Sequence, residues 1–309
     1  MSCDSKRVRP PPRQCPRGGE GRSRNAADCA AQARRRRPQT GKVAADEVLR
    51  ARVLADLGQS RTPRQIAGRL HLEAQDETVG LMNASPPADG RTVSHEAIYR
   101  FIYALPKGEL AKYGVLLRSK RTRRRRPRPL GEHGAPIVGM TSIDAREDVA
   151  DRRVPGHWEG DLIIGAHGKS AAATLVERTT RYTLILALPD GKASTALADV
   201  LIDNANELPA MMRKTLTWDQ GSQMARRAAF TLATSMPVFF AHPHSPWERG
   251  TNENTNGLIR EYLPKGTTIT DHQPYLTSIA EELNERPRAS LGFLTPREAF
   301  ERLLVASTP

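Results

Sequence analysis

Apolar residues recur at helical spacing in three segments of the first hundred residues. The first segment covers residues 43–58 and repeats its apolar positions about every 3.6 residues. The second starts at Thr62, which can cap a helix that has Pro63 at its first position and Gln65 as the reciprocal capping partner. Together with the third segment, this pattern predicts a small all-α module over residues 43–117.

The third helical segment begins after Ser94, whose hydroxyl can cap its first turn. Its polar face carries His95, Tyr99 and Arg100. Three short helices in basic surroundings are compatible with a helix-turn-helix-like module, whose last helix would contact DNA through these side chains. The preceding loop of about 20 residues is longer than a tight turn, so an ordinary three-helix packing module stays an alternative.

Strand-like runs replace the helical repeat from about residue 154. Runs rich in β-branched and apolar residues predict strands over 157–165, 171–178, 182–189, 215–219 and 237–241. Helices are predicted over 194–207, 251–263 and 275–284, and a helical or irregular stretch is predicted between the last two strands, up to Ser235. A further helix is predicted after Thr295, which forms a capping box with Glu298 and is followed by Pro296 at the first helical position. The order β-β-β-α-β-α-β indicates a mixed α/β domain over 154–303, with a tail at 304–309.

The positive charge is concentrated in the first part of the chain. Residues 1–130 hold 29 Lys and Arg against 12 Asp and Glu, whereas residues 131–309 hold 18 against 22. This asymmetry favours a polyanionic partner, most commonly nucleic acid, although Arg-rich segments can also be solvated linkers. The Pro/Arg-rich leader, residues 1–42, contains too few apolar residues for a core and is predicted to be disordered.

A basic linker is predicted over residues 118–153. It begins with RSKRTRRRRPR, which holds eight basic residues and can lie along phosphates in an extended form. The predicted DNA contacts in it are Arg121, Arg123, Arg124, Arg125 and Arg126. A solvated tether is the alternative, and a short strand is possible near residues 137–140.

The chain contains neither a signal-peptide pattern nor an apolar stretch of about 18 residues, so the sequence predicts a cytoplasmic, nucleoid-associated protein without membrane contact. Cys3, Cys15 and Cys29 have no paired or zinc-binding spacing. They are interpreted as incidental.

Three carboxylates fall where the predicted elements can bring them together. Asp161 lies in the first strand, Asp219 ends the fourth strand, and Glu253 lies in the first turn of a helix. In mixed α/β sheets, sites form where strand ends and helix starts converge. Carboxylates at such a place suit Mg²⁺ or Mn²⁺ in phosphodiester chemistry. Glu159, on the same strand face as Asp161, and Glu177 are alternatives that the strand pattern leaves open.

Polar residues around Glu253 form a second candidate group. Asn252, Asn254 and Asn256 are unusual in a helix, because asparagine competes for local backbone hydrogen bonds. Contacts with DNA or contacts within the site would explain them, and ordinary exposure is the alternative. Asn252, Asn256 and Arg260 are predicted to contact DNA. The nearby HPH at 242–244 is a weak metal-binding candidate.

Several motifs resemble the insertion-sequence transposases of the IS-thirty type, within the DDE transposase and retroviral integrase superfamily. They are VPGHWEGDLIIG at 154–165, TLVERTTRY at 174–182, LTWDQGSQMA at 216–225, HPHSPWERGTNENTNGLIREYLPKGT at 242–267 and NERPRASLGFLTPREAF at 284–300. The resemblance implies an RNase H-like, retroviral integrase-type core behind the helical module. It assigns the catalytic and metal-binding roles to Asp161, Asp219 and Glu253 and thereby favours Asp161 over Glu159.

The resemblance also implies an activity. Two Mg²⁺ or Mn²⁺ ions would support cleavage at transposon ends, and the freed 3′-hydroxyl would then attack target DNA. The expected partners are double-stranded DNA, as terminal inverted repeats and target, and a second copy of the chain, since synapsis of two ends needs at least a dimer.

The leader departs from the family pattern. Family members begin with a further helix-turn-helix region, of which only Arg24-Asn25 has a counterpart here. This departure motivates a rival hypothesis, a catalytically silent or truncated element product that acts as a DNA-binding protein or repressor. A related nuclease that cleaves without joining is a further alternative.

Overall fold

The computed structural model describes residues 41–106, 141, 143, 154–191, 193–219, 224–242 and 250–306. The chain divides into two compact units, Met1–Gly41 and Lys42–Pro309, and the description below concerns the second. The predicted leader and nearly all of the basic linker lie outside the described residues, and so do the five linker arginines predicted to contact DNA, Arg121, Arg123, Arg124, Arg125 and Arg126.

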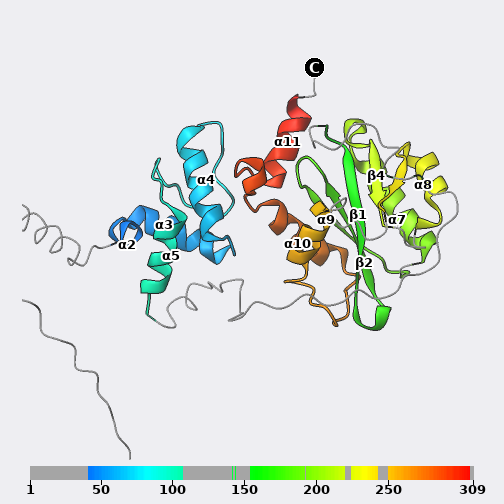
Figure 1. Ribbon diagram of the computed structural model, residues 1–309, viewed down its shortest axis with the longest axis horizontal. Helices are drawn as coiled ribbons and strands as arrows, with labels where there is room; N and C mark the ends of the chain where they lie inside the picture. The colour runs from blue at the N-terminus through cyan, green and yellow to red at the C-terminus, as the bar shows by residue number, and fades with distance from the viewer. Residues whose placement is uncertain are drawn as a thin grey trace, which may run out of the picture. The chain divides into compact units, whose positions relative to one another are not determined.

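Four helices form the helical module, which is defined here as residues 42–106 (blue to cyan in Figure 1). They are α2 (Lys42–Ala45), α3 (Glu47–Gly58), α4 (Pro63–Gln75) and α5 (His95–Ala104). The predicted helix starts are confirmed: Thr62 and Gln65 form the capping box of α4, and Ser94 caps α5. The first predicted segment is divided by Asp46, whose side chain accepts a hydrogen bond from the Leu49 N–H and starts α3.

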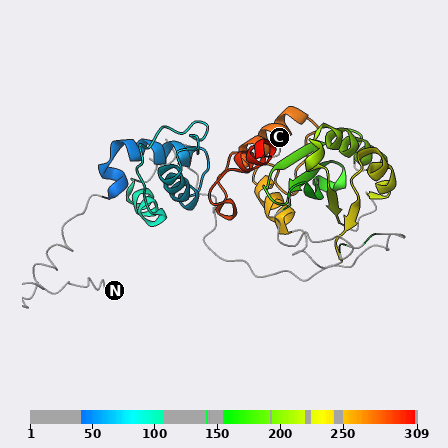
Figure 2. The same cartoon turned by 90° about the horizontal axis from the view of Figure 1, so that it is seen from above.

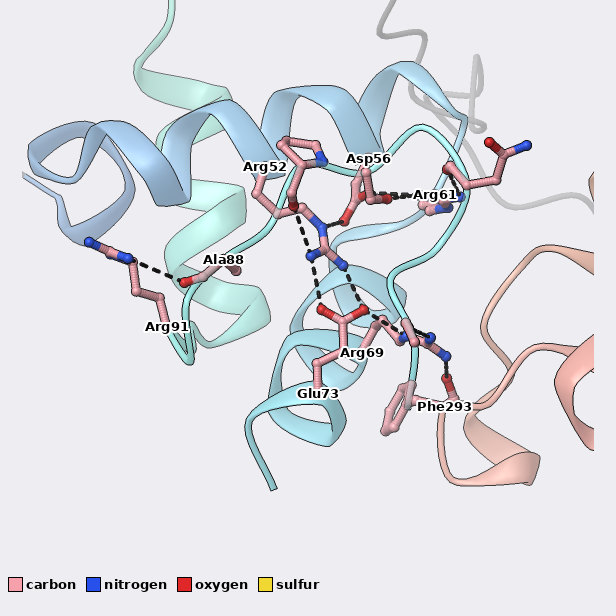
Figure 3. A network of polar contacts seen from close by, with 12 residues as sticks. Arg52, Asp56, Arg61, Arg69, Glu73, Ala88, Arg91 and Phe293 are labelled. Atoms are coloured by element: carbon pink, nitrogen blue, oxygen red, sulfur yellow. Dashed lines mark hydrogen bonds and ion pairs between the residues drawn. The ribbon is translucent and has the colours of Figure 1, made fainter. Parts of the chain in front are cut away.

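Charged side chains are buried in the helical module beside its apolar core. Arg52 pairs with Asp56 and Glu73, each at 2.9 Å. Arg61 also pairs with Asp56 at 2.6 Å, and Arg69 pairs with Glu73 at 2.8 Å (Figure 3). The apolar core around this network consists of Val43, Leu49, Val53, Leu57, Ile66, Leu70, Ala88, Val93, Ile98, Phe101 and Ile102. The module therefore combines apolar burial with a connected set of ion pairs.

A five-stranded mixed sheet forms the centre of the second half of the chain. Its strands are β1 (His157–Ile164), β2 (Ala171–Glu177), β3 (Thr183–Ala187), β4 (Thr215–Trp218) and β5 (Val238–Phe240). Their order is β3-β2-β1-β4-β5. The pairs β1–β2 and β2–β3 are antiparallel, whereas β1–β4 and β4–β5 are parallel. The predicted fold class and the order of its strands and helices are confirmed.

Helices cover both faces of the sheet, as Figure 2 shows around the green strands. On one face, α7 (Ser194–Glu207) and α8 (Arg227–Thr234) pack on an apolar cluster that includes Trp158, Leu216 and Trp218. On the other face, α9 (Gly250–Ile259) and α10 (Gln273–Asn284) pack with Ile163, Ala172 and Ile185. Because side chains alternate along a strand, the odd-numbered residues of β1 and β4 face the α9 layer.

Close packing at the sheet centre requires a glycine in β1. A Cβ atom on Gly160 would lie 2.2 Å from the ring of Trp218, so any larger residue would displace this fully buried side chain. Trp158 is fixed in the same layer, because its indole N–H donates to the Met212 carbonyl at 2.8 Å. The face of β1 that carries the even-numbered residues is therefore tightly packed and supports the opposite face, which carries the odd-numbered residues.

One predicted helix end is wrong. Helix α9 ends at Ile259 instead of residue 263, and the chain turns over residues 260–262 before Pro264, which disfavours helical backbone at the residue before it. Helix α11 (Pro296–Ala306) includes Leu304, which packs against the apolar cluster of the sheet. None of the helices in the described part of the chain has the length and apolarity needed to cross a membrane.

Candidate active site

Asp161 lies on β1, the central strand, and faces the α9 layer in a half-buried position. Its Oδ1 accepts a hydrogen bond from the Leu162 N–H at 2.8 Å, and its Oδ2 accepts one from the Asn256 side-chain amide at 2.9 Å. The carboxylate is therefore held from its own strand and from α9. Its orientation is fixed while one side remains accessible to solvent.

Thr174 on β2 controls the amide of Asn256. The Thr174 hydroxyl lies 3.1 Å from Asn256 Oδ1 and 3.2 Å from the Asp161 carbonyl oxygen. When the oxygen of the amide accepts from Thr174, its NH₂ group points toward Asp161. Sequence reasoning missed Thr174. The available signal was a single hydroxyl side chain within the otherwise apolar run AAATLV of β2.

Asp219 directly follows Trp218, the last residue of β4. In the parallel pairing, Glu159 is opposite Thr217, the last residue of β4 that pairs with β1. Asp219 follows Thr217 by two residues, as Asp161 follows Glu159 by two residues along β1. Asp219 is exposed. Residues 220–223, which follow it, lie outside the described residues.

Glu253 lies in the first turn of α9 and is exposed. It precedes Asn256 by three residues, a spacing that makes the two side chains neighbours on the helix surface. Since Asn256 contacts Asp161, Glu253 lies on the part of α9 that borders this carboxylate. Within the described part of the chain, however, no three His, Cys, Asp or Glu side chains are gathered as a preformed metal cage.

The two alternative carboxylates, Glu159 and Glu177, have structural roles. Glu159 is 1% exposed, pairs with Arg178 at 3.1 Å and accepts from the Asn252 N–H at 3.0 Å. Glu177 is buried and accepts from the Gly156 N–H and from both the N–H and the hydroxyl of Thr180. Both carboxylates are buried and hold loops and strands together, which leaves Asp161 as the half-exposed carboxylate of β1.

Asn252 has a role different from the predicted DNA contact. It is 0% exposed, and its amide donates to the Glu159 carbonyl at 3.0 Å. Its Oδ1 lies 3.3 Å from the Thr174 hydroxyl. Asn252 and Asn256 lie four residues apart and therefore share the face of α9 that is directed toward the sheet. Through its hydrogen bonds, Asn252 holds α9 against the sheet. The sequence alone does not show which asparagines face the sheet.

Arg260 is a cation close to the same carboxylate. Its guanidinium donates to the Ile164 carbonyl at 3.0 Å and to the Leu263 carbonyl at 3.4 Å. Partial burial lowers the pKa of Arg260 from its usual value, and the nearby Asp161 acts in the opposite direction. Arginine stays protonated at neutral pH in spite of such shifts. The site thus has a positive group at the end of β1.

The other predicted contact residues lie on α5. His95 and Arg100 are exposed, and Tyr99 is partly exposed. His95 packs edge-on against Tyr99, which stacks on Tyr103 with ring centroids 6.3 Å apart. Tyr103 is 75% exposed and was not predicted as part of this surface, although its spacing of four residues from Tyr99 would have indicated it. Arg100 lies 3.4 Å from Glu96.

Comparisons with known proteins agree on the kind of protein. The family model for the integrase core domain matches residues 151–246, a range that includes Asp161 and Asp219. The transposase for insertion sequence element IS1086 of Cupriavidus metallidurans is 42% identical over 296 residues, which cover 94% of this chain and 83% of that protein. Transposase InsI for insertion sequence element IS30C of Escherichia coli is also 42% identical, over 82% of this chain and 64% of that protein.

More distant proteins are also similar. The transposase for insertion sequence element IS4351 of Bacteroides fragilis is 32% identical over 88% of this chain and 78% of that protein. Among solved structures, the catalytic core domain of BIV integrase is 16% identical, with a TM-score of 0.39 over 50% of this chain and 99% of that chain. The identity to the first relative extends over nearly the whole chain. This chain belongs to the IS30 family of insertion-sequence transposases, and its residues 151–246 match the integrase core domain.

Proposed function

We propose that this chain is a DDE-type transposase that cleaves DNA at transposon ends and joins the freed 3′-hydroxyl to target DNA. The observation that carries the proposal is the fixed orientation of Asp161 on the central strand, held by Asn256 at 2.9 Å, with Asp219 directly after the neighbouring parallel strand β4. Glu253 borders the same place from α9. These are the three acidic positions of the family motif.

The proposed metal ligands are Asp161, Asp219 and Glu253. Their donor atoms are all carboxylate oxygens, which are the hard ligands that Mg²⁺ and Mn²⁺ take, so the chemistry of these residues suits such ions, of which two are proposed. When bound, the metals would stabilise the attacking and leaving oxygens of an in-line displacement. Asn256 and Thr174 would keep the Asp161 carboxylate oriented. Arg260 would offer a positive group to a phosphate that approaches along β1.

DNA is the proposed macromolecular partner, as terminal inverted repeats and as target. The exposed His95 and Arg100 and the partly exposed Tyr99 would contact it from the helical module. The linker arginines, Arg121, Arg123, Arg124, Arg125 and Arg126, would add contacts to the phosphate backbone. Bringing two transposon ends together calls for two copies of the chain, so at least a dimer is proposed.

The test is nicking and strand transfer on a duplex that carries the matching transposon ends, with Mg²⁺ or Mn²⁺. Loss of a residue that only supports a metal ligand costs about 10–100-fold. We therefore expect Asp219→Asn to lower the rate by more than about 100-fold. Asp199→Asn, an exposed carboxylate on α7, is the matched control and should retain the wild-type rate. Unchanged activity of Asp219→Asn would refute the site.

The rival function is DNA binding without catalysis. The strongly basic first part of the chain supports DNA binding whether or not the carboxylates act. Salt-dependent binding by the wild type, with neither nicking nor joining in Mn²⁺, would favour the rival. Nicking without joining would indicate a nuclease instead, and strand transfer would exclude both alternatives.

A further inference from the structure

A groove with a basic lining lies on the helical module. Its volume is about 420 Å³, and it is lined by residues from α2, α4 and the start of α5, together with one residue from the C-terminal part of the chain. Its basic and aromatic lining side chains are Lys42, Arg64, His71, His95 and Phe293. We call this feature the α4–α5 groove.

The charge of the α4–α5 groove is positive. Lys42, Arg64, His71 and His95 are all exposed, and among the described residues the lining includes neither Asp nor Glu. The amino end of α5 also contributes, because the first turn of a helix carries a partial positive charge. Arg64 and His71 lie two turns apart on the same side of α4. Basic residues of α2, α4 and α5 therefore line the same groove.

The groove has a fixed wall on one side. A Cβ atom on Gly68 would lie 2.2 Å from the ring of Phe293, so glycine allows this ring to pack directly on the α4 backbone. Gln65 donates to the Pro287 carbonyl at 2.9 Å on the same side of α4. Residues more than 200 positions apart in the sequence thus build one surface, and the helical module alone would not supply it.

Arg69 holds Phe293 and the residues that follow it against α4. It is 0% exposed, and two of its nitrogens donate to the two carboxylate oxygens of Glu298, each at 2.6 Å. It also donates to the Phe293 carbonyl at 3.4 Å, to Gly80 at 2.7 Å and to Glu73 at 2.8 Å (Figure 3). All five N–H donors of the guanidinium are used, which fixes α4 against the segment 293–298.

We propose that the α4–α5 groove binds the phosphate backbone of duplex DNA. Phosphate suits the lining because Lys42 and Arg64 supply two permanent cations, while the described lining residues include no carboxylate that would repel it. Phe293 adds an apolar ring to the same lining. The inference rests on the proposed function only in that the chain binds DNA, and it does not depend on catalysis.

The test is the salt dependence of DNA binding by the full chain, measured as fluorescence anisotropy of a labelled duplex at graded NaCl concentrations. Each lost phosphate contact lowers the slope of log K against log salt by about 0.9. We expect the double variant Lys42→Ala/Arg64→Ala to lower it by about 1.8. The matched control is Arg213→Ala/Lys214→Ala, which removes the same charge before β4, far along the sheet from Asp219, and should keep the wild-type slope.

A gain-of-charge variant guards against effects of misfolding. Ala67 lines the groove and is partly exposed, so Ala67→Lys adds one cation to it. We expect tighter binding and a slope increased by about 0.9. The proposal would be overturned if Lys42→Ala/Arg64→Ala and Ala67→Lys both kept the wild-type salt slope. It would also be overturned if Arg213→Ala/Lys214→Ala lowered the slope as much as Lys42→Ala/Arg64→Ala does. If the wild type fails in strand transfer while the groove variants change the slope as expected, the catalytic proposal fails and the groove stands.

Discussion

The helical module and the sheet domain place charged groups in contrasting ways. Arg69 in the module is fully buried, and its five donors meet two glutamates and two carbonyls. Asp161 in the sheet is half-buried and is oriented by a backbone N–H and an amide, while one side stays accessible. A buried charge with a complete set of partners fixes one structure, whereas an oriented charge at the surface can still bind a ligand. The comparison separates charges that hold the fold from charges that serve chemistry.

The largest effect is expected where a buried charge loses its partner. Arg69→Met would leave the partly buried Glu298 without its guanidinium, and Glu73 would keep only the guanidinium of Arg52. Breaking such a buried pair costs about 3–5 kcal/mol. The measurement is the free energy of unfolding in urea. Arg100→Met is the control, because exposed pairs such as Arg100–Glu96 contribute at most about 1 kcal/mol. Equal losses in the two variants would contradict the distinction between the two kinds of charge.

The sequence predicted those features that depend on neighbouring residues. Helix starts at Thr62 and Ser94 were recognised because the capping hydroxyl and the backbone N–H that donates to it lie three residues apart. Runs of β-branched and apolar residues predicted the strands of the sheet. The buried network of Arg52, Arg69 and Glu73 was not predicted, because charged residues on a helix are usually solvated. Burial of these residues depends on packing between helices, which sequence spacing does not encode.

The candidate site shows the same limit. Asp161 was recognised as one of several acidic candidates, and the family motif distinguished it from Glu159. The hydrogen bonds from Asn256 to Asp161 and from Thr174 to Asn256 join residues 95 and 82 positions apart. No local pattern encodes such a contact. The structure therefore adds the residues that orient the carboxylate.

The second prediction tests that orientation. Asn256→Ala removes the amide that donates to Asp161 but leaves every carboxylate in place. Loss of a group that orients a metal ligand costs about 10–100-fold in metal affinity or activity. The Mn²⁺ concentration for half-maximal nicking should rise accordingly, while the midpoint of unfolding changes little. Asn254→Ala, an exposed neighbour on α9, is the control. Loss of activity with an unchanged Mn²⁺ requirement would contradict a positioning role.

A smaller effect is expected at the start of α11. The Thr295 hydroxyl accepts from the Glu298 N–H at 3.1 Å, and Glu298 accepts in return from the Thr295 N–H at 2.8 Å. Thr295→Ala removes the capping hydroxyl and should cost about 1 kcal/mol in the urea experiment. Thr295→Ser keeps the hydroxyl and should stay close to the wild type. A loss in Thr295→Ser as large as in Thr295→Ala would assign the effect to packing of the threonine methyl group.

The smallest expected effect is a pH dependence of the contact between Glu298 and Arg69. Burial raises the pKa of Glu298, but hydrogen bonds from Arg69 and Thr295 together outweigh it and hold the pKa below its usual value. A carboxylate whose pKa is lower in the folded than in the unfolded state stabilises the fold above the unfolded pKa, and this contribution is lost as pH falls through the folded pKa. The free energies of unfolding of the wild type and Glu298→Gln should therefore differ most near pH 7 and converge as the solution is acidified toward the lowered pKa. Arg69 keeps its charge over this pH range. If the difference in free energy of unfolding between the wild type and Glu298→Gln stayed constant with pH, the stabilisation would come from shape and hydrogen bonding. The charge of Glu298 would then contribute as little as the charges of exposed ion pairs.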